Sequence, residues 1–160
     1  ARRAAHGFNM RVLYHNRKRL AAHLEDDLRA SYRELPDLLR ESRHVLLALP
    51  YSPAAYHLIG AAELTQMQPG ATLVNIARGG VVDETALAHA LHSGHLGAAG
   101  LDVFEGEPAV NPALLAAPRL VLTPHIASSS IPTRRAMAQL AVDNLVAVLQ
   151  GQPPITPVTG

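Results

Sequence analysis

The sequence contains no cysteine and no tryptophan, and only 4% of its 160 residues are aromatic. Without cysteine, neither a disulfide framework nor a cysteine-ligated zinc site can form. A core with so few aromatic side chains must be built from Ala, Val, Leu and Ile, which favours helices packed on a parallel sheet. The absence of cysteine also fits a reducing compartment, so we expect a cytoplasmic protein.

Charge of one sign and long apolar runs are missing as well. The formal net charge is +1, which is too balanced to indicate nucleic acid or a membrane surface as a partner. No apolar run approaches the roughly 20 residues that span a bilayer. His89, His92 and His95 are close in sequence, but they fall on different predicted elements and no acid completes a metal site. We therefore expect no nucleic acid, membrane or metal partner.

Short apolar runs alternate with stretches that have helical character. Five runs of four to six residues are typical of strands buried on both faces, namely Met10–Tyr14, His44–Leu49, Thr72–Ile76, Ala98–Val103 and Leu120–Thr123. Between and after them, helices are predicted over Pro36–Arg43, Ala61–Met67, Asp83–Ser93, Asn111–Ala117 and Pro132–Leu149. This alternation predicts an α/β fold with a doubly wound parallel sheet, Rossmann-like. We expect a dinucleotide-binding and catalytic domain over 1–150 and an extended, loosely held tail over 151–160.

Ligands of such folds bind at the carboxyl ends of the strands, and a basic turn follows the first apolar run. Asn16 is followed there by Arg17, Lys18 and Arg19. In a dinucleotide fold this turn lies beside the adenosine ribose, where an acid would bind the ribose hydroxyls and repel a 2′-phosphate. The basic residues instead offer charge-assisted bonds to phosphate. We expect NADP rather than NAD, the alternative being a solvated basic turn before a helix.

Two later strand ends carry candidate catalytic groups. Arg78 follows TLVNI and precedes two glycines, where its guanidinium could bind a carboxylate through two hydrogen bonds. The alternative is a surface arginine before a helix. His125 follows LVLT and could act as a general acid–base near neutral pH, with Asp102 or Glu107 as its acidic partner. A histidine in isolation is more often structural or exposed, so the case for His125 depends on these neighbours.

Four segments resemble one enzyme family. NIARGGVVDETALAHAL, GAAGLDVFEGEP and LTPHIASSS, preceded by LALPYSPAAYHLIG, are similar in order and spacing to the D-isomer-specific 2-hydroxyacid dehydrogenases. The resemblance covers the chain from about Arg11 to Leu149. It implies hydride transfer between NAD(P)H and a small 2-keto or D-2-hydroxy acid. The basic YHNRKR turn and the phrase GEPAVNPALLAAPRLVLTPHIASS resemble most the glyoxylate/hydroxypyruvate reductases and 2-ketogluconate reductases of the family, and we favour the former. The alternatives are a D-3-phosphoglycerate dehydrogenase-like enzyme and a non-enzymatic, NAD(H)-binding corepressor-like protein.

The resemblance also implies a role for individual residues. Arg78 matches the residue that binds the substrate carboxylate, and His125 matches the proton donor to the keto oxygen. Glu107 matches the partner that keeps this histidine protonated and oriented. Members of the family are usually dimers, so a homodimer is expected. Cofactor contacts are expected at Asn16, Arg17, Leu49, Pro50, Ile76, Ala77, Arg78, Asp102, His125 and Ala127.

The chain departs from the family pattern at its start. The glycine-rich GxGxxG loop and the first strand before it are absent, and ARRAAHGF resembles the end of the helix that normally follows this loop. The substrate domain of the family is mostly absent too. Because the cofactor pyrophosphate normally binds backbone N–H groups at that helix start, we expect the chain to have little activity by itself.

Overall fold

A computed structural model describes residues 1–158, which form two compact units, one over Ala1–Thr123 and one beginning at Pro124. In the described residues, no helix is long and apolar enough to cross a membrane. The second unit holds one helix, α6 (Ile131–Leu149). The elements of the first unit are the π-helix η1 (Arg3–Gly7), β1 (Val12–Tyr14), α1 (Ala22–Leu28), β2 (Ala30–Tyr32), α2 (Leu35–Glu41), β3 (His44–Leu47), η2 (Pro53–Ala55), α3 (Ala61–Gln66), β4 (Thr72–Asn75), η3 (Gly79–Val81), α4 (Glu84–His92), β5 (Ala98–Leu101), α5 (Pro112–Leu115) and β6 (Leu120–Leu122).

The strands form two parallel sheets. β1 pairs with β2, and the larger sheet has the order β3-β4-β5-β6. A helix connects the strands of each adjacent pair, so both sheets are built from βαβ units. The predicted Rossmann-like α/β fold is confirmed by these parallel sheets with flanking helices.

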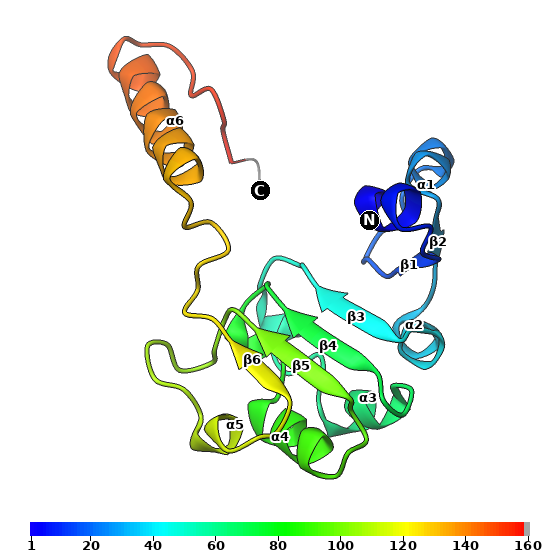
Figure 1. The fold of residues 1–160 in the computed structure, drawn as a ribbon. Coiled ribbons are helices and arrows are strands. Elements are labelled where there is room, and N and C mark those ends of the chain that lie inside the picture. The colour runs from blue at the N-terminus through cyan, green and yellow to red at the C-terminus, as the bar shows by residue number, and fades with distance from the viewer. Residues whose placement is uncertain (159–160) are drawn as a thin grey trace. The chain divides into compact units, whose positions relative to one another are not determined.

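One face of the four-stranded sheet carries the core. Val45, Leu47, Leu73 and Leu101 alternate with outward-facing neighbours and are almost fully buried. Figure 1 shows α3, α4 and α5 together on one face of this sheet. Leu64 of α3, Leu87 of α4 and Leu114 of α5 belong to the same buried cluster. The core therefore lies between one sheet face and these three helices.

The opposite face of the same sheet is apolar but exposed. Leu46, Val74 and Val121 are 60%, 37% and 65% exposed. The prediction of strands buried on both faces is therefore wrong for the described residues, because helices of this unit cover only one face. Apolar side chains without alternation nevertheless indicate a face that another segment would cover.

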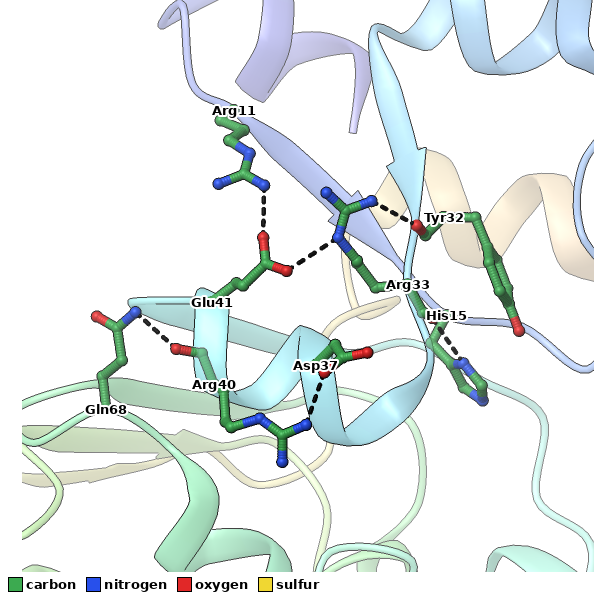
Figure 2. Close-up of polar contacts among 8 residues, drawn as sticks. All are labelled: Arg11, His15, Tyr32, Arg33, Asp37, Arg40, Glu41 and Gln68. Atoms are coloured by element: carbon green, nitrogen blue, oxygen red, sulfur yellow. Dashed lines mark hydrogen bonds and ion pairs between the residues drawn. The ribbon is translucent and has the colours of Figure 1, made fainter.

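A charged network attaches the two-stranded sheet to α2 (Figure 2). Glu41 of α2 accepts a hydrogen bond from Arg11, which precedes β1, at 2.5 Å, and one from Arg33, which follows β2, at 3.0 Å. These two arginines, Arg33 foremost, hold the pKa of Glu41 below its usual range. The Arg33 carbonyl also lies 2.9 Å from Nδ1 of His15. The turn after β1 is thus connected to the helix that leads into the larger sheet.

All five predicted strands and all five predicted helices are present, mostly with shorter bounds. One α-helix and one strand were missed, besides the short 3-10 turns η2 and η3: α1 has no side-chain cap and no buried residue, and β2 has only three residues, ASY, without an apolar run. The predicted tail over 151–160 extends beyond the described residues, and up to residue 158 it contacts α6 through Asn144. The backbone N–H of Thr156 donates to Oδ1 of Asn144 at 3.0 Å, and Nδ2 of Asn144 donates to Oγ1 of Thr156. The helical start of the chain is the π-helix η1.

Candidate active site

The turn that carries Arg78 is fixed by a buried asparagine. Asn75, the last residue of β4, is 1% exposed. Its Nδ2 donates to the Arg78 carbonyl at 2.9 Å, and its Oδ1 accepts from the Ala77 N–H at 3.0 Å. The backbone on both sides is thereby held, while the Arg78 side chain is exposed and donates to the Ala77 carbonyl. Sequence reasoning missed Asn75, although a polar residue inside TLVNI was the available signal.

The residue after Arg78 packs directly on the neighbouring strand end. A Cβ on Gly79 would overlap the backbone of Phe104 and Glu105, so only glycine fits between the two segments. Phe104 and Glu105 belong to the loop that follows β5, called here the acid loop (residues 102–107). The Arg78 turn and the acid loop are therefore in backbone contact.

Two carboxylates anchor the acid loop, one from the loop itself and one from α4. Oε1 of Glu107 accepts from the Phe104 N–H at 2.9 Å. Oε1 of Glu84, on the first turn of α4, accepts from the Glu105 N–H at 2.7 Å. Glu84 is 4% exposed, and burial raises its pKa. Sequence reasoning missed Glu84, because its partner lies 21 residues away.

The segment after β3 contacts the acid loop through the side chain of Glu105. The Tyr56 hydroxyl donates to Oε1 of Glu105 at 2.8 Å, and Nε2 of His57 lies 3.1 Å from Oε2. The two rings are stacked with centroids 3.9 Å apart, and the His57 N–H donates to the Gly80 carbonyl. The hydrogen bond to Glu105 raises the pKa of Tyr56. Segments beyond β3, β4 and β5 are thus connected by direct contacts.

The candidate cofactor residues of the larger sheet fall along its carboxyl edge. The buried carboxylate of Asp102 accepts a hydrogen bond from Oγ1 of Thr123 at 2.6 Å, which connects the ends of β5 and β6. Since β3, β4 and β5 are neighbours in register, their following residues share this edge. The structure therefore brings together these predicted residues: Leu49, Pro50, Ile76, Ala77, Arg78, Asp102 and Glu107.

The remaining candidates lie elsewhere in the chain. Asn16 and Arg17 are exposed in the turn after β1. His125 and Ala127 belong to the second unit, where His125 is exposed and has a left-handed backbone with φ 53°. The convergence of His125 with Arg78 and Glu107 stays a prediction. In the part of the chain that the structure describes, no three His, Asp or Glu side chains are grouped to hold a metal.

A family model decides the relationship of this chain to known proteins. The model of the NAD-binding domain of D-isomer specific 2-hydroxyacid dehydrogenases matches residues 1–127. The chain belongs to this family. The resemblance that the sequence motifs indicated is confirmed.

The chain is similar over almost its whole length to proteins named as reductases and dehydrogenases. It is 47% identical to the glyoxylate reductase of Thermococcus gammatolerans over 154 residues, which cover 96% of the chain and 46% of the relative. The holo structure of Rhodotorula graminis D-mandelate dehydrogenase matches with TM-score 0.93 and 38% identity, covering 99% of this chain and 47% of that one. The NADPH-dependent glyoxylate/hydroxypyruvate reductase of Sinorhizobium meliloti, in complex with NADP and malonate, matches with TM-score 0.90 and 36% identity, covering 98% and 48%. The chain thus spans about half the length of these relatives.

Proposed function

We propose that the protein carrying this chain is an NAD(P)H-dependent reductase of small 2-keto acids, with glyoxylate or hydroxypyruvate as substrate. The contact between the Arg78 turn and the acid loop is the observation that carries this proposal. It supports a site in which a guanidinium and the Glu107 carboxylate come from neighbouring strand ends. The names of the relatives support the same substrate class.

In the proposed reaction, three side chains have separate roles. Arg78 binds the substrate carboxylate through two hydrogen bonds and so orients the keto carbon. When bound, the nicotinamide supplies the hydride. Negative charge that develops on the keto oxygen is neutralised by a proton from His125, and Glu107 holds that imidazole in its protonated form. General acid catalysis of this kind contributes about 10²–10⁴-fold to the rate.

The residues of the first unit fit a dinucleotide at the carboxyl edge. We assign to Asp102 the role of accepting a hydrogen bond from the cofactor's carboxamide; the hydrogen bond from Thr123 supports this role by orienting the Asp102 carboxylate. Asn16 and Arg17 present an exposed, acid-free turn after β1, which favours NADP(H) over NAD(H). A related reductase of known structure holds NADP, which supports the same choice.

The two sheets support a proposal about the rest of the protein. In the described residues, β1 pairs only with β2, and β3 pairs only with β4. We infer that a further parallel strand lies between β1 and β3, followed by the glycine-rich turn that binds pyrophosphate. A separate substrate domain, a nucleotide-binding domain that extends over 1–150 and a homodimer belong to the same proposal.

The proposed reaction is tested in the complete protein with NADPH and glyoxylate. We expect His125→Ala to lower kcat by about 10²–10⁴-fold, because the proton donor is lost, while NADPH still binds through its other expected contacts. Arg78→Lys should raise the KM for glyoxylate, since an ammonium cannot form the paired hydrogen bonds. His89→Ala, an exposed histidine on α4, serves as the control and should leave kcat and KM unchanged. Undiminished turnover of the His125 variant would instead support a non-enzymatic, NAD(H)-binding protein.

A further inference from the structure

The three basic residues of the turn after β1 have different surroundings. Nε and Nη2 of Arg19 donate to the two oxygens of Glu25, both at 2.8 Å. Arg17 and Lys18 are exposed, and among residues 1–158 neither side chain forms a hydrogen bond or ion pair. One of the three cations is therefore engaged within the protein, and two remain available to a ligand.

Glu25 connects three parts of this region. Besides Arg19, it accepts a hydrogen bond from the Tyr14 hydroxyl at 2.5 Å, and that hydroxyl in turn accepts one from the Leu20 N–H at 2.9 Å. The Glu25 side chain is only 11% exposed. Arg19, followed by Tyr14, lowers the pKa of Glu25 to about 2, so the carboxylate is charged at neutral pH. The turn is thus held at both of its ends by one side chain of α1.

We propose that Glu25 is a positioning residue for cofactor discrimination: through Arg19 and Tyr14 it fixes the turn so that Arg17 and Lys18 bind the 2′-phosphate of NADP(H). This inference rests on the proposed function, since it assumes that a dinucleotide binds at this turn. A turn that is already ordered loses less conformational entropy when it binds a ligand, which strengthens binding. Arg17 and Lys18 then supply the charge-assisted bonds to phosphate.

Glu25 has two opposite effects on a bound phosphate. The direction in which phosphate affinity changes when Glu25 is removed therefore tests the proposal. Its negative charge lies near the turn and repels a phosphate, so removing it should strengthen binding if charge alone matters. Its hydrogen bonds order the turn, so removing them should weaken binding if positioning matters. The partial exposure of the site lets solvent and salt reduce the charge effect. We therefore expect the loss of order to dominate.

The test compares two small probes by calorimetry on the complete protein. Adenosine 2′,5′-bisphosphate carries the 2′-phosphate and adenosine 5′-monophosphate does not. We expect Glu25→Ala to weaken binding of the bisphosphate about tenfold and to leave the monophosphate unaffected, comparable to losing one charge-assisted contact. Unchanged or tighter binding of the bisphosphate by this variant would overturn the proposal.

Matched variants separate positioning from charge and from loss of folding. Asp26→Ala removes the same charge from the next, exposed residue of α1 and should not weaken binding of the bisphosphate. Glu25→Gln keeps an oxygen acceptor and should have an intermediate effect. Arg19→Ala should also weaken binding of the bisphosphate, and the double variant should lose less than the sum of the two single losses, because Arg19 and Glu25 share a contact. Fully additive losses in the double variant would contradict the proposal.

Kinetics distinguish failure of this inference from failure of the proposed function. With glyoxylate, Glu25→Ala should raise the KM for NADPH about tenfold while kcat and the KM for NADH stay constant. An equal change for both cofactors would assign Glu25 a general structural role and overturn the inference. Absence of turnover in the unmodified protein would overturn the proposed reaction, whereas the two binding probes would still report on Glu25.

Discussion

Glu84 is a buried acid whose carboxylate stabilises a loop, while its burial disfavours the charged form of that carboxylate. Its carboxylate accepts the Glu105 N–H at 2.7 Å and so anchors the acid loop to α4. Burial raises its pKa, and the charge of Glu105 adds to this effect, whereas the backbone N–H lowers it. The hydrogen bond and the desolvation of the charge therefore act in opposite directions on stability.

We expect the free energy of unfolding to depend on pH through Glu84. Because its pKa in the folded state lies above the ordinary 4.5, the folded state binds the proton more readily than the unfolded state, and stability falls as pH rises through this window. Glu84→Gln, which keeps the acceptor, should remove this part of the pH dependence and be at least as stable at about pH 7. Glu84→Ala should cost about 1–3 kcal/mol, because the Glu105 N–H loses its partner. Urea unfolding at several pH values measures both, and a Gln variant less stable than the unmodified protein at neutral pH would contradict the account.

At the level of elements, the Arg78 turn and the acid loop depend on each other for their positions. Gly79 leaves no space for a Cβ against the backbone of Phe104 and Glu105. These atoms belong to main chain and cannot move by a simple change of rotamer. A methyl group at this point must therefore separate the two loops.

Gly79→Ala should accordingly lower the free energy of unfolding by about 2–3 kcal/mol, as overpacking does in cores. It should also raise the KM for glyoxylate, because Arg78 moves away from the acid loop. Gly7→Ala is the control, since no heavy atom lies within 4 Å of a Cβ there. Thermal unfolding and steady-state kinetics on both variants measure the difference. Equal stability of the two variants would show that the loops can separate without cost.

At the level of the whole molecule, the exposed apolar sheet face has a predictable consequence. Leu46 and Val121 lie on this face and are 60% and 65% exposed. Such contiguous apolar surface is uncommon on a free protein and marks a place where other structure packs. The helix that we infer after the glycine-rich turn would supply that cover, because helices pack on the faces of a parallel sheet.

The 160-residue chain alone should therefore bind a hydrophobic dye such as ANS and have little activity, while the complete protein should bind far less dye per chain. Leu46→Thr and Val121→Thr should reduce dye binding by the isolated chain. In the complete protein, each should cost about 1–2 kcal/mol, because the side chains are then buried. Equal dye binding by both forms would show that the face stays uncovered.

The sequence by itself determined the fold class, the family and most of the elements. Apolar runs and helix signals are local, so the strands before Arg78 and His125 could be read directly, and these residues follow from their places after those runs. The short elements α1 and β2 were not predicted, because neither has a buried apolar pattern of its own. β2 pairs with β1, 18 residues earlier in the chain, a contact that no local pattern specifies.

Only the tertiary structure decided which polar side chains hold the candidate site in place. Glu84 and Glu105 are 21 residues apart, and Tyr56 and Glu105 are 49 apart. Asn75 and Glu25 act over shorter separations, but their partners are set by a strand end and a turn whose geometry no residue pattern specifies. Hydrogen bonds require atoms within about 3 Å of each other, and that proximity arises only when the chain has folded.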